Sequence, residues 1–320
     1  GGWVLDESVS LGVLVAFLLY AQRFFRPISD MSEKFNILQS AMASSERIFT
    51  LLDTPVKTQS PTKPTPRPAP AKGRIEFDGV WFAYGDDNYV LRDVSFVVEP
   101  GERIGIVGAT GAGKTTIINL LMRFYDVSRG RILVDGIDVR ELSLSDLRGL
   151  SSLVLQDAHL FAGSIAANVR LGDQTITDAE IRAAITSVHA KPFIDQLPAG
   201  LASPVAERGA TLSVGQKQLL TFARALVYEP RVLVLDEATS SVDTETEVLI
   251  QDALRVLMKG RTTIAIAHRL STIQDMDRIL VLHKGQLREA GTHQELLARR
   301  GIYYKLYQLQ YQEQEIAAAG

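Results

Sequence analysis

Hydrophobic positions along the chain follow three successive patterns. Residues 1–53 begin with an apolar run at 9–21 (VSLGVLVAFLLYA), which passes into a segment whose apolar side chains recur near helical spacing. Those side chains are Phe35, Leu38, Met42, Ile48 and Leu52. From residue 74 onward, short β-branched runs alternate with longer helical stretches, which is typical of an α/β layer. The pattern predicts one long helix followed by an α/β domain at 74–310.

The apolar run at 9–21 is shorter than the roughly twenty residues that a helix needs to cross a bilayer, so by itself it could also be a buried core helix. Two features favour a membrane. Cationic residues (Arg23, Arg26, Lys34) lie on its C-terminal side, where a cytoplasmic end would be. The helical pattern also continues beyond them. We interpret 1–53 as the end of a transmembrane helix with its cytoplasmic extension.

Proline marks the boundary between the two zones. Six of the twelve prolines lie in residues 54–73 (TPVKTQSPTKPTPRPAPAKG). Proline lacks a backbone donor and restricts its neighbour, so neither a helix nor a central strand fits here. We expect a semi-extended linker at 54–73, the α/β domain at 74–310 and a short tail at 311–320.

The apolar runs within the domain predict two kinds of strand. RIGIVG, RILVDG, SSLVLQ, RVLVLD and TTIAIA are interpreted as strands of a largely parallel core sheet. RIEFDGVWFAY and VSFVVEPGERI are more typical of antiparallel strands joined by turns. The expected fold is therefore a mixed α/β sheet core.

Composition narrows the class of protein. Apolar residues make up 46% of the chain and charged residues 22%, which suits a sizeable buried core. The net charge of −3 offers no basic balance for a nucleic-acid partner. With no cysteine there is no disulfide framework, zinc knuckle or thiol nucleophile, and a cytoplasmic setting is permitted.

A glycine-rich loop, GATGAGKTT, lies directly after the strand RIGIV and before the helical stretch IINLLMRFY. Its G-x4-G-K-T spacing is the P-loop pattern in the strand-to-helix context that the pattern requires. Backbone N–H groups and the helix N-terminus would hold phosphates, Lys114 would reach the β- and γ-phosphates, and Thr115 would ligate Mg²⁺. The nucleotide-binding loop comprises Gly108, Ala109, Thr110, Gly111, Ala112, Gly113, Lys114, Thr115 and Thr116.

A second apolar strand, in VLVLDEATS, delivers Asp236 at its C-terminal end, where open α/β sheets place ligands. Asp236 can hold Mg²⁺ through water, because Mg²⁺ keeps much of its hydration shell. Glu237 follows and is the candidate to orient or deprotonate the attacking water. An acidic loop after a strand is common, but behind a P-loop it indicates a catalytic role.

The stretch LSVGQKQLLTFARAL also looks built to receive an anion. Ser213 and Gln216 match a capping box at the start of a helix, with Gly215 between them. Alone, the motif could simply cap that helix. A helix terminus contributes only about 0.3–2 kcal/mol to anion binding, which is too weak to hold a nucleotide unaided.

Taken together, these motifs resemble those of the ATP-binding cassette (ABC) ATPases, and LSVGQ looks like their signature. The resemblance implies a P-loop NTPase with a mixed sheet core, an antiparallel β subdomain and a helical subdomain. It also implies that two such domains pack head to tail. Ser213, Gly215 and Gln216 would then close over ATP held by a partner's P-loop.

The remaining family positions follow from the same resemblance. Tyr84 in WFAY corresponds to the aromatic that stacks on adenine, with Trp81 and Phe82 as nearby alternatives. Gln156 corresponds to the glutamine that senses Mg²⁺ and the γ-phosphate. Asp243 corresponds to the loop that links the two sites, and His268 to the switch histidine at the γ-phosphate. The implied ligands are ATP and Mg²⁺.

The stretch RPISDMSEKFNILQSAMASSERIFTLLD resembles the end of the last transmembrane helix of exporter-type half-transporters. The resemblance implies a C-terminal portion of an exporter in the cell (plasma or inner) membrane, with the nucleotide domain on the cytoplasmic side. Its partners would be a transmembrane domain and a second nucleotide domain, identical or different, with no nucleic acid. One departure is Val214, which stands where the signature more usually has glycine.

Two other functions compete with ATP-driven export. A soluble ABC ATPase acting on nucleic acid or ribosomes would be expected to carry tandem cassettes, a coiled-coil insertion or basic surfaces, and the apolar leader opposes it. A regulatory cassette that binds ATP without hydrolysing it would be expected to lack Glu237 or His268, and both are present.

Overall fold

The structure, a computed structural model, describes residues 10–85, 88–155, 158–236, 244–266 and 270–309. They form two compact units, which divide between Lys57 and Thr58. Each unit is described by itself.

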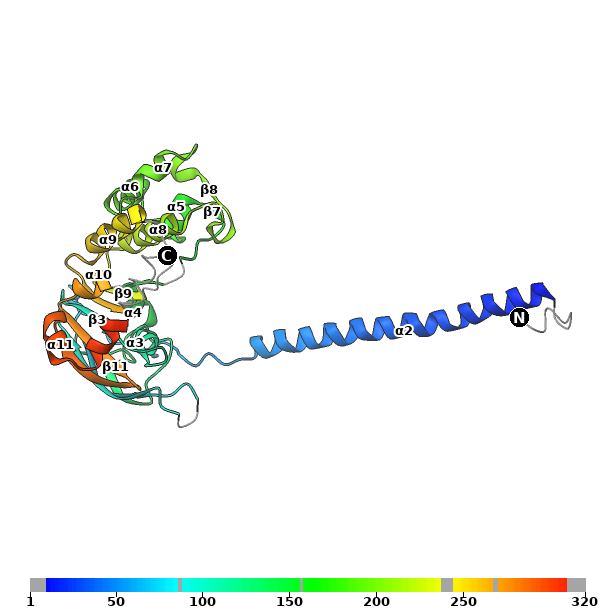
Figure 1. Cartoon of the computed structure of the whole chain (residues 1–320), viewed down its shortest axis with the longest axis horizontal. Helices are drawn as coiled ribbons and strands as arrows, with labels where there is room; N and C mark the ends of the chain where they lie inside the picture. The colour runs from blue at the N-terminus through cyan, green and yellow to red at the C-terminus, as the bar shows by residue number, and fades with distance from the viewer. Residues whose placement is uncertain (1–9, 86–87, 156–157, 237–243, 267–269, 310–320) are drawn as a thin grey trace. The chain divides into compact units, whose positions relative to one another are not determined.

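The first unit is a single helix, α2 (Leu11–Leu52), of 42 residues. Ser10 caps its N-terminus by accepting a hydrogen bond from the Val13 N–H, and Pro27 lies inside it. None of its residues is buried. Among the described residues it is the one helix long and apolar enough to cross a membrane, judged by length and composition. The prediction of one long helix across this zone is confirmed (Figure 1).

The second unit contains an antiparallel sheet of strand order β2-β1-β4-β5. Its strands are β1 (Ile75–Phe82), β2 (Leu91–Val98), β4 (Arg129–Val134) and β5 (Ile137–Asp138). The antiparallel arrangement expected for RIEFDGVWFAY and VSFVVEPGERI is confirmed, because β1 pairs with β2 and Phe77 lies opposite Phe96. The expectation for RILVDG is wrong, because β4 pairs antiparallel with β1 instead of joining the parallel sheet.

A six-stranded sheet of order β12-β11-β3-β10-β9-β6 forms the centre of the unit. Its strands are β3 (Arg103–Val107), β6 (Ser151–Val154), β9 (Val232–Asp236), β10 (Thr262–Ile266), β11 (Arg278–His283) and β12 (Gln286–Gly291). Every pair in it is parallel except β11–β12. The predicted mixed sheet is confirmed, and its parallel strands end toward the phosphate loop.

Helices cover this sheet and build a separate layer. They are α3 (Lys114–Leu121), α4 (Leu144–Gly149), α5 (Ile165–Arg170), α6 (Asp178–Ser187), α7 (Lys191–Asp195), α8 (Val214–Val227), α9 (Thr244–Met258), α10 (Leu270–Gln274) and α11 (His293–Arg299). Helix α8 packs against α5, α6 and α9. Figure 1 shows α5 to α8 gathered beside the short pair β7 (Gly163–Ser164) and β8 (Pro204–Val205), apart from β3 and β11.

Strand alternation assigns the two faces of the central sheet to two apolar clusters. On β9, Val232 and Val234 join the cluster shared with the antiparallel sheet, whereas Leu233 and Leu235 join the cluster shared with the helical layer. All four side chains are at most 2% exposed. A strand buried on both faces is expected to be continuously apolar, as VLVL is. This burial fixes Asp236 at the end of β9.

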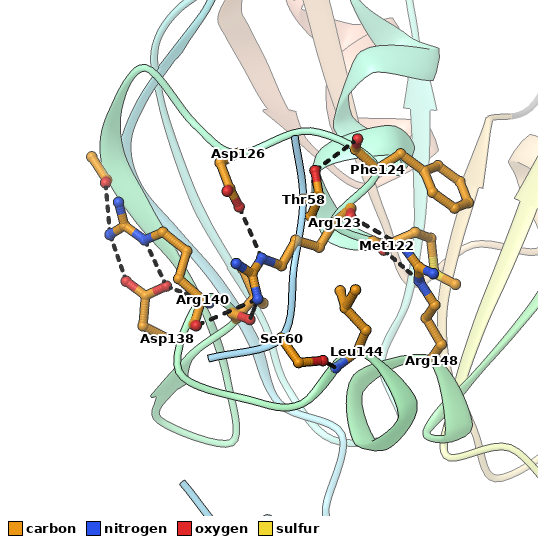
Figure 2. Close-up of polar contacts among 12 residues, drawn as sticks. Thr58, Ser60, Met122, Arg123, Phe124, Asp126, Asp138, Arg140, Leu144 and Arg148 are labelled. Atoms are coloured by element: carbon orange, nitrogen blue, oxygen red, sulfur yellow. Dashed lines mark hydrogen bonds and ion pairs between the residues drawn. The ribbon is translucent and has the colours of Figure 1, made fainter. Parts of the chain in front are cut away.

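The proline-rich segment has no regular structure, as expected, but its larger part belongs to the second unit (Figure 2). The Thr58 hydroxyl donates to the Phe124 carbonyl at 3.3 Å, and Ser60 Oγ accepts from the Leu144 N–H at 3.0 Å, at the start of α4. Farther on, the Thr65 N–H donates to the Glu141 carbonyl at 2.9 Å. Residues 58–72 therefore form a strap on the second unit.

Arginine side chains hold the loop that the strap meets (Figure 2). Arg123 is 5% exposed, and its Nε lies 2.8 Å from Asp126 Oδ1. Its Nη1 donates to the Val139 and Arg140 carbonyls, both at 3.4 Å. Arg148 of α4 donates to the Met122 and Arg123 carbonyls. The residues directly after α3 are thus fixed to α4 and to the loop that precedes it.

A histidine in the C-terminal part makes stability depend on pH. The buried Tyr303 hydroxyl lies 2.6 Å from His293 Nδ1. Burial raises the pKa of Tyr303, which therefore stays protonated as donor, and burial lowers the pKa of His293 below 6.5. The unfolded chain then binds the proton more readily than the folded chain, so stability is complete above about pH 6.5 and falls below it. We expect a small decrease in the thermal midpoint from about pH 7.5 to about pH 5.5. The decrease should be reduced in His293→Gln.

Candidate functional site

A cavity of about 440 Å³ opens above the phosphate loop at the end of the central strands. It is lined by Tyr84, Val90, Thr110, Gly111, Gly113, Lys114, Thr115, Thr116 and Asp236. The loop residues, Asp236 and the aromatic Tyr84 were predicted from separate motifs. The fold brings these residues together in one cavity, except Gly108, Ala109 and Ala112 of the predicted loop, which are not among its lining residues.

The turn from β3 into α3 needs glycine at its last position. Gly113 has φ 102°, and a Cβ there would lie 2.6 Å from Leu91 Cδ2. A side chain would be strained and would also collide with β2. As a consequence, α3 begins without a side-chain cap. Its first N–H groups and the positive end of its dipole are available for phosphate oxygens.

Lys114 is buried in the loop, with 8% exposure. Its Nζ donates to the Gly108 carbonyl at 2.7 Å and to the Ala109 carbonyl at 3.2 Å. Burial lowers the pKa of Lys114, while the nearby charge of Asp236 acts in the opposite direction. A desolvated ammonium that donates to two carbonyl oxygens and lies near one carboxylate can bind a more highly charged anion such as a phosphate.

Thr115 and Asp236 supply oxygen atoms to the same cavity. Hydroxyl and carboxylate oxygens, with room for water, are the ligands that Mg²⁺ prefers. These two residues therefore fit the predicted metal. Gln156, Glu237, Asp243 and His268, the other predicted site residues on the family pattern, lie outside the described residues.

The three aromatic candidates for a nucleobase differ in accessibility. Phe82 is 3% exposed and belongs to the core. Trp81 is half-buried, with Tyr89 edge-on at 5.4 Å and the Arg129 guanidinium 5.9 Å from its ring centre. Tyr84 is 49% exposed and lines the cavity. Accessibility therefore favours Tyr84.

The start of α8 has the predicted capping box. The Gln216 N–H donates to Ser213 Oγ at 3.2 Å, and the Ser213 N–H donates to Gln216 Oε1 at 3.0 Å. Ser213 and Val214 are exposed. The cap uses a lone pair of the Ser213 oxygen, which leaves its hydroxyl hydrogen to donate elsewhere. Ser213, Gly215 and Gln216 are not among the residues that line the cavity.

Gly215 has a role inside its own chain as well. A Cβ at this position would lie 2.1 Å from Thr246 Cγ2, so α8 and α9 can approach only because Gly215 has no side chain. Substitution here would disturb helix packing before any ligand is considered.

Comparisons with known proteins agree with this geometry. The family model described as ABC transporter matches residues 91–240. The fatty acid ABC transporter ATP-binding/permease protein of Mycobacterium tuberculosis is 49% identical over 303 residues, which are 95% of this chain and 48% of that protein. The probable multidrug resistance ABC transporter ATP-binding/permease protein YheH of Bacillus subtilis is 47% identical over 314 residues, 97% of this chain and 46% of that protein. The chain carries an ABC transporter domain.

A solved structure extends the likeness to the fold. A bacterial Atm1-family ABC exporter with ATP bound matches the chain with a TM-score of 0.75 and 40% identity, over 94% of this chain and 52% of that one. The chain spans about half the length of the relatives it matches. The α/β domain is thus an ATP-binding cassette of the exporter type, preceded by a long helix.

One structural residue of this cassette was missed in the sequence analysis. Arg224, on α8, donates from Nε to the Asn168 carbonyl at 2.9 Å and from Nη1 to the His159 carbonyl at 3.0 Å. Asn168 in turn holds both the N–H and the carbonyl of Phe161, each at 2.8 Å. The helix that begins at Ser213 is thereby tied to the segment that follows Gln156. An arginine within an otherwise apolar helical stretch, LLTFARAL, was the available signal.

Proposed function

We propose that this chain is the ATP-hydrolysing motor of an ABC exporter, in which two nucleotide domains join head to tail around ATP and drive transport across a membrane. The observation that carries the proposal is the exposed start of α8. Ser213 and Val214 present a helix N-terminus to solvent, outside the chain's own phosphate cavity. An anion site separated from the cavity in this way suits a nucleotide held by another chain.

Within one composite site each residue has a chemical task. Lys114 and the loop N–H groups hold the phosphates, Tyr84 contacts the adenine, and Ser213 with the start of α8 binds the γ-phosphate from the partner. Thr115, Asp236 and Gln156 would hold Mg²⁺, which neutralises phosphate charge. Glu237 orients the attacking water, His268 contacts the γ-phosphate, and Asp243 links the two sites.

The membrane part of the proposal rests on α2 and on the relatives. An 18-residue window of α2 has a mean hydropathy of 1.4. The cations Arg23, Arg26 and Lys34 lie toward the cytoplasmic end expected for an exporter. The relatives are named as ATP-binding/permease proteins, so they combine a cassette with a membrane domain. We place the chain in the plasma or inner membrane, with its cassette in the cytoplasm and a transmembrane domain as partner.

The test is Val214→Asp, with Val214→Asn as the uncharged control of equal size. A carboxylate in the first turn of α8 favours the helix dipole, so the fold should be kept. The same charge would repel a partner's nucleotide. We expect ATP binding by the monomer to stay at the parental level while ATP turnover falls at least about tenfold, since like charges face each other at a desolvated interface.

The control should keep most of the parental turnover. Turnover per molecule should also fall on dilution of the parental chain, because each site needs two chains. Parental turnover in Val214→Asp, or turnover independent of protein concentration, would contradict the composite site. Gly215→Asp is a less direct test, because it also displaces Thr246.

A further inference from the structure

The Tyr84 hydroxyl is bonded to the phosphate-loop helix. Its oxygen lies 3.2 Å from Thr116 Oγ1 and accepts a hydrogen bond from Asn119 Nδ2, also at 3.2 Å. Thr116 and Asn119 are one turn apart on α3, so both reach the same point beside the helix. Thr116 is 5% exposed and adjoins Thr115, the candidate Mg²⁺ ligand. One hydroxyl therefore joins the aromatic end of the cavity to its phosphate end.

Two neighbouring rings hold Tyr84 without covering it. Phe82 lies 4.8 Å away at 84°, and Tyr125 lies 5.0 Å away at 90°. Both are edge contacts, and neither ring is parallel to Tyr84. Flat, offset stacking is the arrangement a nucleobase would adopt on an aromatic ring. Tyr84 is 49% exposed, so a ring fixed from its hydroxyl and its edge contacts still offers surface for stacking.

We propose that Asn119 is a positioning residue that, together with Thr116 and Tyr125, holds the Tyr84 ring ready for a purine base before the nucleotide arrives. The inference rests on the proposed function and adds how the base end of the site is organised. Asn119 acts through Tyr84 and not on the phosphates.

The physical reason is conformational freedom. Tyr84 lies two residues beyond the end of β1 at Phe82 and so outside the strand ladder, where an unbonded side chain would sample several rotamers. Binding a base would then require the ring to be ordered at that moment, which lowers affinity. The bonds to Asn119 and Thr116 order it in advance. Inorganic tripolyphosphate has no base, so the ordering of the Tyr84 ring has no effect on the affinity for that ligand.

The difference between these two ligands gives the test. In the full chain, we would measure the affinities for ATP and for tripolyphosphate of Tyr84→Phe, which keeps the ring, and of Asn119→Leu, which keeps the volume. Tyr304→Phe is the matched control, because the Tyr304 hydroxyl also accepts from an amide, Gln308 Nε2 at 3.1 Å, in the helical segment at 302–309 that follows α11. We expect ATP affinity to fall about three- to tenfold in both site variants, the effect of one or two neutral hydrogen bonds.

Tripolyphosphate affinity should be unchanged in all three variants, and Tyr304→Phe should bind both ligands like the parent. Unchanged ATP affinity in Tyr84→Phe and Asn119→Leu would overturn the positioning role. Equal loss of both ligands would also overturn it, because that result means a damaged phosphate loop. If the parental chain bound neither ligand, the proposed function itself would be refuted. If the parental chain hydrolysed ATP and the two site variants bound ATP as tightly as the parent, only this inference would be refuted.

Discussion

Lys114→Met is expected to reduce ATP turnover at least about a hundredfold, the usual scale for removing a preorganised charge from a transferring group. Lys114 is buried, and its ammonium donates to the carbonyls of Gly108 and Ala109 at the edge of the cavity, so the substitution removes a fixed positive charge from the place where phosphates would bind. Methionine has similar length and no charge. It also removes a desolvated cation, so we expect the thermal midpoint to be kept or raised.

The measurement is steady-state phosphate release together with equilibrium binding of ATP. Lys259→Met is the matched control, because Lys259 is an exposed lysine on the same domain. It should behave as the parent does. Turnover in Lys114→Met within a few-fold of the parental rate would show that the cavity above the loop is not where phosphoryl transfer occurs.

Glu237→Gln is expected to slow hydrolysis by about 10²–10⁴-fold, the range for loss of general-base assistance. Its neighbour Asp236 is fixed at the end of the buried strand β9 and lines the cavity. Because the amide keeps the shape of the carboxylate, ATP should still bind. The nucleotide-bound pair of chains should therefore accumulate.

Sedimentation or size-exclusion measurements with ATP and Mg²⁺ would detect that pair, with Glu141→Gln, an exposed substitution, as control. If Glu237→Gln hydrolysed ATP at the parental rate, another group would have to activate the water.

The parts of the site that follow from local sequence were predictable. The phosphate loop, the capping box at Ser213 and the position of Asp236 each depend on a short motif and its flanking strand or helix, and the structure has all three. The continuous apolar run VLVL predicted equally well that β9 is a buried strand. These features need no knowledge of what lies across the fold.

Strand pairing was harder, and β4 shows why. RILV is apolar enough for a parallel core strand, but its buried residues alternate, with Ile132 and Val134 inward. Asp135-Gly136, both at positive φ, then turn the chain into β5. An Asp-Gly turn after an alternating strand is a hairpin signal, and it outweighs the apolar run.

Contacts between distant segments could not be predicted. The bond between Asn119 and Tyr84 joins a helix to a loop residue two positions beyond a strand, and no spacing in the sequence encodes it. The strap likewise depends on Thr58 and Ser60 meeting carbonyl and amide groups far along the chain. Proline content shows what 58–72 cannot form, but not what it lies against.

Arg224 is held by carbonyl and side-chain amide oxygen atoms, which carry no net charge. Dissolved ions weaken exposed pairs such as Arg255 with Asp252, since water and counterions reach both partners. A desolvated guanidinium on carbonyl oxygens is shielded far less. The contact between α8 and the segment at His159 should therefore persist at high salt concentration, where the surface ion pairs of the same domain no longer contribute to stability.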